Sequence, residues 1–217
     1  MELRVRNLKN KKEILENSDY YINVENSKKH KGAWNRYFKN DKPICLEIGC
    51  GKCKFIYEKA KSNPDKNFIG IERIDTVLAL GIKEIEKNEK ISNLVLINLD
   101  ALEIKDVFSN EIETLYLNFS DPWPKARHHM RRLSSEVFLN KYDNIFRKDK
   151  EIYMRTDNKD LFEYSIESLS KHGYILEDVS LDLHSSIDVE SLITTEYEDK
   201  FSSMDLPIYS VKAIKRK

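Results

Sequence analysis

The sequence predicts an α/β fold: a doubly wound, mostly parallel seven-stranded sheet with an antiparallel edge. After Pro43, short apolar runs rich in β-branched residues alternate with stretches of helical period. The first apolar run ends in Gly49-Cys50-Gly51, and glycines permit the sharp turn from a strand into a helix. The length of 217 residues suits one such domain. These three observations favour a parallel sheet with helices on both faces.

The elements are expected in a regular order. Strands are predicted at residues 44–48, 67–71, 93–99, 112–119, 151–155, 174–181 and 208–214. Helices are predicted at residues 52–61, 74–88, 101–108 (a short helical turn), 134–147 and 158–171, and Ser134 is the expected N-cap of the fourth. The last two strands lack a strong helical crossover, so they are expected to pair antiparallel at one edge.

The composition narrows the function classes. Charged residues make up 34% of the chain, and no apolar run approaches the roughly 20 residues that span a bilayer. The N-terminus lacks an apolar signal core, so we expect a cytoplasmic protein without membrane contact. Three cysteines lie close together, including a C-x-x-C at Cys50 and Cys53. A zinc site needs about four ligands, so no metal is expected. A redox pair is the alternative to reduced cysteines that serve as small residues in a turn.

The net charge is zero, but the charges are segregated. Residues 1–42 carry eleven Lys/Arg against six Asp/Glu, whereas residues 176–206 carry nine acids against one lysine. We therefore divide the chain into a basic N-terminal extension, residues 1–42, and a main domain, residues 43–217. The extension is expected to pack on the core or to contact RNA, because a basic segment suits nucleic acid even when the total charge is neutral.

Carboxylates follow three neighbouring predicted strands. Glu47 precedes the glycine turn, Glu72 ends the second strand, and Asp100 follows the third. Ligands of doubly wound sheets bind at these carboxyl ends. A dinucleotide oxidoreductase would need glycine at position 54, which is lysine, and a methyl-donor loop usually has glycine at 53, which is cysteine. The glycine loop alone therefore does not decide between these two cofactor classes, and a purely structural role for the glycines is a third alternative.

Two of these carboxylates, Glu47 and Asp100, favour S-adenosylmethionine over a dinucleotide. Glu47 could accept from the cationic methionine end of this donor, whereas it would repel a pyrophosphate. Glu72 is placed to hold two ribose hydroxyls. Asp100, with the backbone N–H next to it, can read an adenine edge.

The most unusual stretch follows the fourth predicted strand. Asp121-Pro122-Trp123-Pro124 is followed by Lys125, Arg127, Arg131 and Arg132, with two histidines and no acid between them. A carboxylate, a rigid corner, an indole and a cationic strip can hold a purine base beside a phosphate backbone. The alternative is a solvated basic loop. Trp123 could stack on the base, but packing under this loop is favoured, because a tryptophan between two prolines has little freedom to adjust to a ligand.

Six motifs appear in one order: E-I-G-C-G-K-C (47–53), I-G-I-E (69–72), L-D-A (99–101), D-P-W-P-K-A-R-H-H-M-R-R-L (121–133), T-D-N (156–158) and T-T-E-Y-E (194–198). Together they resemble the bacterial tRNA (guanine-N7-)-methyltransferases, which are S-adenosylmethionine-dependent enzymes of the Rossmann-like fold. The likeness spans roughly Trp34 to the C-terminus. The run beginning D-P-W-P-K is its specific part, since the glycine loop is common to many methyltransferases.

The resemblance implies a set of site residues. Donor contacts are implied at Glu47, Gly49, Gly51, Glu72, Asp100, Ala101 and Asp121. Substrate contacts are implied at Lys125, Asp157, Thr195, Glu196, Tyr197 and Glu198. RNA contacts are implied at Arg127, His128, His129, Met130, Arg131 and Arg132. Two residues depart from the pattern: Cys53 replaces a usual glycine, which would narrow the space near the donor, and Met130 stands where another lysine is expected, which would weaken one phosphate contact.

The implied reaction transfers a methyl group to the N7 atom of a guanine in the tRNA variable loop. N7 carries an unprotonated lone pair, so Asp121 is expected to position the base instead of acting as a general base. Asp157 could hold the base or could cap the helix that follows. The competing functions are an RNA-binding module that has lost catalysis and a nicotinamide-dependent oxidoreductase. The expected partner is tRNA, and the chain is expected to be a monomer or a homodimer.

Overall fold

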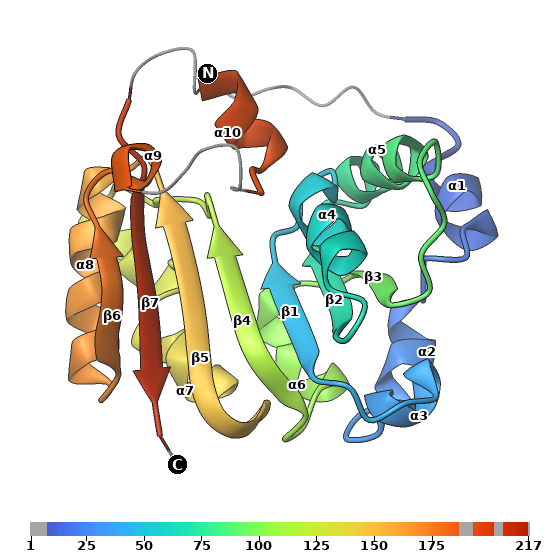
Figure 1. Cartoon of the computed structure of the whole chain (residues 1–217), viewed down its shortest axis with the longest axis horizontal. Coiled ribbons are helices and arrows are strands. Elements are labelled where there is room, and N and C mark those ends of the chain that lie inside the picture. The colour runs from blue at the N-terminus through green and yellow to red at the C-terminus, as the bar shows by residue number, and fades with distance from the viewer. Residues whose placement is uncertain (1–7, 187–192, 202–205, 217) are drawn as a thin grey trace.

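A computed structural model describes residues 8–186, 193–201 and 206–216, and it holds a seven-stranded sheet (Figure 1). The strand order is β3-β2-β1-β4-β5-β7-β6. The strands are β1 (Ile44–Ile48), β2 (Asn67–Glu72), β3 (Leu94–Asn98), β4 (Ile112–Asn118), β5 (Phe146–Thr156), β6 (Ile175–Ser180) and β7 (Tyr209–Lys215). Strands β1 to β5 pair in parallel, and β7 lies antiparallel between β5 and β6. The predicted sheet with an antiparallel edge is confirmed.

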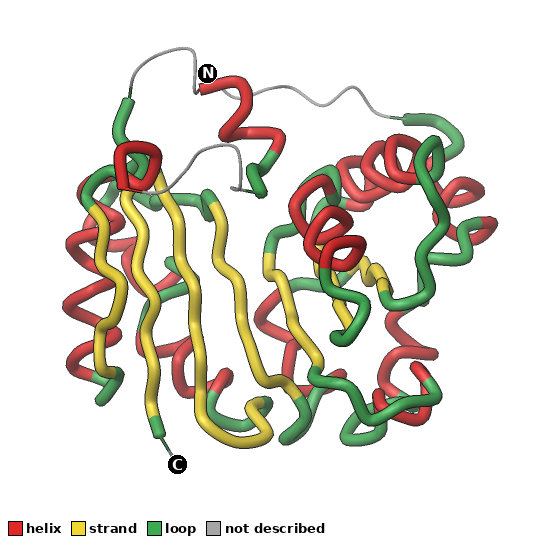
Figure 2. The backbone as a smooth tube through the Cα atoms, in the orientation of Figure 1, coloured by secondary structure: helices red, strands yellow, loops and turns green. Residues whose placement is uncertain are grey.

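Helices and loops surround the strands (Figure 2). The helices that follow the strands are α4 (Lys54–Ser62), α5 (Asp75–Ile85), α6 (Ile104–Val107), α7 (Glu136–Tyr142), α8 (Lys159–Lys171), α9 (Leu183–Ser186) and α10 (Glu196–Phe201), with 3-10 helices η1 (Ala101–Glu103) and η2 (Ala126–Arg131). In Figure 1, α4 and α5 lie on the viewer's side of β1 to β3, and α6 and α7 lie behind the sheet. Successive strand residues alternate between two apolar cores: Cys45 packs with α4 and α5, and Leu46 packs in the core that holds α7 and α8.

Two predicted boundaries in the middle of the chain are wrong. The helix expected to reach Arg147 ends at Tyr142, and β5 begins at Phe146, five residues before its predicted start. The apolar stripe misled the prediction because Phe146 is a buried strand residue, and periodicity does not separate short buried strands from helix ends. Ser134 is not the N-cap: Ser135 holds that position without a side-chain capping bond, and the buried Ser134 hydroxyl lies 2.6 Å from the Ser165 hydroxyl.

The described part of the N-terminal extension packs on the main domain through α1 (Lys11–Asn17), α2 (Val24–Lys28) and α3 (Trp34–Phe38). The indole of Trp34 is fully buried and donates to the Val107 carbonyl at 3.1 Å. The Leu96 amide donates to the Tyr20 carbonyl at 2.7 Å, and the Ile22 amide donates to the Leu96 carbonyl at 3.0 Å. These bonds place the extension alongside β3. Across the described ranges, no helix is long and apolar enough to cross a membrane.

The cysteines of the glycine turn are free and buried, as expected for small residues in a turn. Cys53 has a φ of 67°, the left-handed conformation in which glycine is favoured. Its side chain is fully buried among apolar residues of α4 and α5. Cys53 therefore keeps the backbone shape of a glycine and sends its thiol into the core, away from the space beside the turn that it was expected to narrow.

Candidate active site

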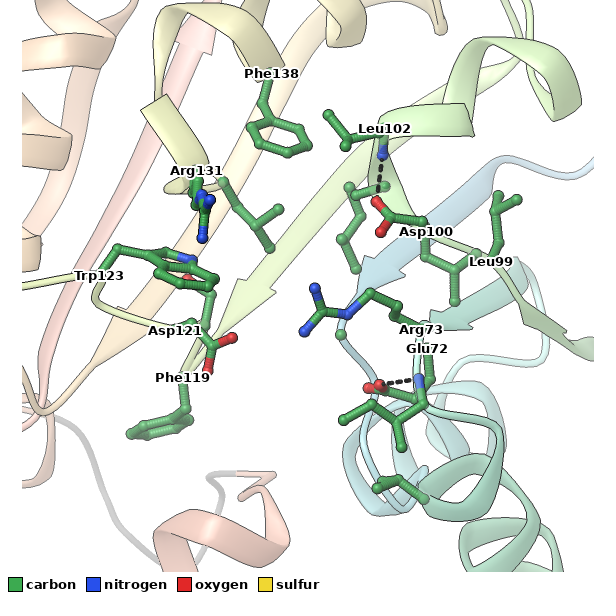
Figure 3. Close-up of a pocket in the computed structure, with 18 of the residues that line it drawn as sticks. Glu72, Arg73, Leu99, Asp100, Leu102, Phe119, Asp121, Trp123, Arg131 and Phe138 are labelled. Atoms are coloured by element: carbon green, nitrogen blue, oxygen red, sulfur yellow. Dashed lines mark hydrogen bonds between the residues drawn. The ribbon is translucent and has the colours of Figure 1, made fainter. Parts of the chain in front are cut away.

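A cavity of about 570 Å³ opens at the carboxyl ends of β1 to β4 (Figure 3). Five of the predicted site residues for the donor line it: Gly49, Glu72, Asp100, Ala101 and Asp121. The other lining residues are Ile48, Ile71, Arg73, Ile74, Val77, Leu99, Leu102, Phe119, Ser120, Trp123, Met130, Arg131, Leu133 and Phe138. Segments far apart in the sequence therefore meet in one pocket with acidic groups on two sides and apolar side chains between them.

Glu72 is fixed at the end of β2 by backbone donors. Its two carboxylate oxygens accept from the Gly51 amide at 3.1 Å and the Ile74 amide at 2.8 Å. Burial raises the pKa of Glu72, and these amides oppose that shift because they favour the charged form. The orientation of the carboxylate is thus set before any ligand enters.

Asp100 is held in a similar way at the end of β3. Its carboxylate accepts from the Leu102 amide at 2.8 Å and caps η1, a bond drawn in Figure 3. Leu99 and Leu102 flank it as apolar walls of the pocket. The pocket therefore combines a polar edge with a flat apolar surface here, which is the combination that a heteroaromatic ring requires.

Glu47 and Gly51 do not line the pocket. The Glu47 side chain is 2% exposed and lies on the α4 side of the sheet. One of its oxygens accepts from the Asn118 amide group at 2.8 Å, and its Oε2 has no hydrogen-bond partner within the described residues. Burial raises the pKa of Glu47 to about 8, although Asn118 and Arg155 oppose the shift. A buried carboxylate oxygen without a donor is a costly arrangement that a cationic ligand would relieve.

The corner after β4 is strained. Phe119 and Trp123 have φ values of 48° and 42°, which are unusual for bulky residues. Asp121 lies between them, exposed, and in the described part of the chain its carboxylate accepts no hydrogen bond. Such strain persists only where surrounding contacts impose it, and it is typical of functional sites. The corner holds the Asp121 carboxylate at the pocket, as Figure 3 shows.

Trp123 was expected to pack under this corner, and that expectation is wrong. The indole is half-buried and lines the pocket. The guanidinium of Arg131 lies 5.0 Å from the centre of the ring, and the His128 ring meets it edge-on at 5.8 Å. Because the two prolines fix the backbone, they present the ring to the pocket instead of burying it.

The basic run forms the 3-10 helix η2 and its flanks. Lys125, Arg127, His129, Met130 and Arg131 are exposed, and His128 is half-buried. Met130 lines the rim of the pocket, so it contributes an apolar wall at the position where a lysine was expected.

Arg132 differs from the other cations of the run. Arg132 is only 8% exposed, and its guanidinium donates to the Pro122 carbonyl at 2.9 Å and the Trp123 carbonyl at 3.3 Å. Its guanidinium also lies 4.4 Å from the centre of the Tyr164 ring. In this conformation Arg132 holds the corner in place, and an RNA contact by Arg132 would require these bonds to be exchanged.

Residues 193–198, which we call the strap, begin α10. Thr195 and Glu198 form a capping box: the Thr195 hydroxyl accepts from the Glu198 amide at 3.0 Å, and the Glu198 carboxylate accepts from the Thr195 amide at 3.2 Å. The Glu198 side chain is fully buried. Of the four strap residues that were predicted to contact substrate, Thr195 and Glu198 therefore cap the start of α10.

The other two, Glu196 and Tyr197, contact the glycine turn and residues at the ends of β4 and β5. Glu196 pairs with Lys52 of the glycine turn at 2.7 Å. The Tyr197 hydroxyl donates to the Asp157 carboxylate at 3.1 Å, and its ring lies 5.1 Å from that of Phe119. Asp157 does not cap α8, because the Asn158 side chain accepts from the Leu161 amide at 2.8 Å and occupies the N-cap. The structure thus brings Asp157 and the strap together.

Comparisons with known proteins identify the family of this chain. A family model described as "Putative methyltransferase" matches residues 41–211. A tRNA (guanine-N(7)-)-methyltransferase of Bacillus velezensis is 47% identical, with 90% of this chain and 89% of the relative covered. One of Lachnoclostridium phytofermentans is 44% identical, with 99% and 100% covered. The chain belongs to the tRNA (guanine-N7-)-methyltransferase family.

The fold has further relatives of low sequence identity. A 16S rRNA adenine-N1 methyltransferase from Catenulisporales acidiphilia, solved with the cosubstrate SAM, superposes with a TM-score of 0.61 at 14% identity, covering 86% of this chain and 91% of the other. The predicted family and the predicted Rossmann-like methyltransferase fold are confirmed, and the nicotinamide-dependent oxidoreductase is wrong.

Three residues of the site escaped the sequence reasoning. Arg73 points into the pocket (Figure 3), Asn118 donates to Glu47, and Arg155 contacts the strap. The capping box could have been found, because Thr195-x-x-Glu198 is its sequence signature. Arg155 and Asn118 carry no such local signal, since their importance depends on pairing between strands.

Proposed function

We propose that this chain transfers a methyl group from S-adenosylmethionine to the N7 atom of a guanine in the variable loop of tRNA. The observation that carries the proposal is the single pocket in which Glu72 and Asp100 of β2 and β3 face Asp121 at the start of the basic run. The first pair suits a nucleoside of the donor, and the basic run suits the RNA that carries the acceptor.

The residues fit the donor. Glu72 would hold the ribose hydroxyls, and Asp100 with the backbone at Ala101 would hold the adenine against Leu99 and Leu102. Glu47 Oε2, which has no hydrogen-bond partner within the described residues, lies buried in β1, two residues before Gly49 of the pocket lining, and would favour the positive methionine end. When bound, S-adenosylmethionine supplies a methyl group that its sulfonium centre activates for transfer.

Methylation of the acceptor requires little acid–base chemistry from the protein. The N7 atom of guanine has a free lone pair, so no proton has to be removed before attack. What remains is alignment and the exclusion of water. Asp121, free of protein hydrogen bonds in the described part, would hold the guanine edge, with Asp157 and the strap on the other side. For Asp157 to accept from the base, Tyr197 must give up its bond to that carboxylate.

The exposed cations would place the tRNA. Lys125, Arg127 and Arg131 would contact phosphates, which gives affinity that falls with salt and carries little sequence information. The Trp123 ring at the pocket wall would stack on a base. His128, His129 and Met130 complete the surface that faces the RNA. We propose that the enzyme acts in the cytoplasm as a monomer or a homodimer.

The test is methylation of an unmodified tRNA transcript with labelled S-adenosylmethionine, followed by nucleoside analysis. We expect 7-methylguanosine from the variable loop and none from a transcript in which that guanine is replaced by adenine. A chain that binds the transcript but forms no 7-methylguanosine would instead be an RNA-binding module without catalysis.

A further inference from the structure

Arg155 connects the end of β5 to α4 and to the strap. It is the penultimate residue of β5, and its side chain is 16% exposed. Its guanidinium donates to the Ile193 carbonyl at 2.9 Å and lies 3.6 Å from Glu198 Oε2. The same group sits 5.4 Å from the centre of the Phe55 ring of α4. One side chain thus joins the sheet, the first helix after the glycine turn and the strap.

On the strap, Arg155 provides the cation that a buried carboxylate requires. Glu198 is fully buried, and its other polar contacts among the described residues are the Thr195 amide and the His184 ring nitrogen at 2.9 Å. A buried carboxylate that loses its cation is strongly destabilised. The position of Glu198, and with it the capping box that shapes the strap, therefore depends on Arg155.

On the donor side, Arg155 continues a row across three strands. It is the register partner of Asn118 in β4, and the Asn118 side chain donates to Glu47 of β1. The positive charge of Arg155 also counteracts the rise in the pKa of Glu47 that burial causes. The row from Glu47 to Glu198 thus places one cation between two buried carboxylates.

The backbone of Arg155 fixes the acceptor corner as well. Its carbonyl accepts from the Phe119 amide at 2.8 Å. Phe119 is the first strained residue of the corner that carries Asp121, and its ring packs on Tyr197 of the strap. A shift of Arg155 would therefore move the corner and the strap together.

We propose that Arg155 is a positioning residue of the methyl transfer, which sets the strap and the Asp121 corner relative to the donor-side carboxylate Glu47. The proposal rests on the proposed function. Arg155 acts through Glu198 and Glu47 and does not line the pocket itself. Its role is geometric, because transfer to N7 depends on alignment, and small misplacements far from the reacting atoms reduce turnover steeply.

The test compares Arg155→Gln with Arg147→Gln. Both change an arginine of β5, but Arg147 lies at the opposite end of the strand, half exposed, 3.9 Å from Glu113. For Arg155→Gln we expect a loss in kcat of about 100-fold, with the tRNA affinity within a few-fold of wild type. Hydrogen exchange at residues 193–198 should become faster. Arg147→Gln should change none of these quantities.

Two further variants separate positioning from a general loss of folding. Arg155→Lys keeps the charge and should recover part of kcat, because an ammonium still neutralises Glu198 but lacks the second donor. Glu198→Gln should accelerate exchange in the strap in the same way, and the double variant with Arg155→Gln should add little, as expected for residues of one network.

The outcomes are distinguishable. Wild-type kcat in Arg155→Gln, or unchanged exchange in the strap, would overturn the positioning role while the proposed function stands. If the wild-type enzyme itself forms no 7-methylguanosine, the proposed function fails, and the exchange measurements still show whether Arg155 orders the strap.

Discussion

The donor side of the pocket, at the ends of β2 and β3, is built differently from the acceptor side, which comprises the Asp121 corner and the strap. Glu72 and Asp100 are oriented by backbone amides, two of which lie only two residues along the chain. The strap is held by side chains that are remote in sequence: Lys52 is 144 residues from Glu196, and Asp157 is 40 residues from Tyr197. The donor side is thus fixed locally, whereas the acceptor side depends on the complete fold.

This difference implies that the two sides of the pocket receive their ligands in different ways. Backbone-held carboxylates need no rearrangement to receive a ligand, so the donor side is preorganised. On the acceptor side, the bond between Tyr197 and Asp157 occupies a carboxylate proposed to hold guanine. Exposed side-chain contacts of this kind are exchanged at modest cost. In the proposed function, the base would therefore enter by replacing a protein contact, whereas the donor would not.

Substitution of Asp121 should have the largest effect and tests the acceptor side directly. Its carboxylate has no protein partner in the described residues, so Asp121→Ala should leave both sides folded and remove only the group that aligns the base. We expect single-turnover methylation to fall by at least about 100-fold, with the tRNA affinity within a few-fold. Asp121→Asn, which keeps the shape, is the matched variant. A collapse of tRNA binding would show that Asp121 holds the RNA instead of aligning it.

The same contrast explains what the sequence could predict. The order of strands and helices, the glycine turn and the carboxylates at the strand ends are local patterns, and Glu72, Asp100 and Asp121 line one pocket. The buried place of Glu47 was not predicted, because its partner Asn118 lies 71 residues away.

The acceptor side was predicted less well for the same reason. Arg132 looks like its neighbour Arg131 in the sequence, and only the folded corner separates a buried arginine from an exposed one. The strap was read as substrate contacts, although Thr195 and Glu198 also carry a local capping signature. Arg155 shows the limit most clearly, since its two carboxylates come from β1 and α10.

The buried carboxylate of Glu47 makes donor binding depend on pH. Its pKa is raised to about 8 from 4.5, so the donor-free enzyme carries a proton on Glu47 at neutral pH. A cationic donor end favours the ionised form, and binding should release this proton. The dissociation constant of S-adenosylmethionine should therefore fall by up to about tenfold between about pH 6 and about pH 7, because one proton is released for each donor molecule that binds. Calorimetry in two buffers of different ionisation enthalpy measures the proton release.

Glu47→Gln is the control for this linkage. The amide does not titrate, so the affinity should be flat over the same range. The raised pKa of Glu47 also affects folding stability. It stabilises the donor-free fold at low pH, and this contribution is lost as the pH rises through about 8, whereas an acid whose pKa is lowered by an ion pair stabilises the fold at high pH. A wild-type affinity that is as flat as that of the variant would show that Glu47 does not sense the donor.

The smallest expected effect tests whether adjacent arginines belong to different parts of the acceptor side. Arg131→Ala removes an exposed cation, so the tRNA affinity should fall a few-fold at moderate salt. The slope of log affinity against log salt should lessen by about one, without loss of thermal stability. Arg132→Ala removes the bonds to the Pro122 and Trp123 carbonyls, which should lower the thermal midpoint, at a cost of about 1–3 kcal/mol, and leave the salt slope unchanged. If both variants reduced the slope equally, Arg132 would have to give up its bonds to the corner when tRNA binds.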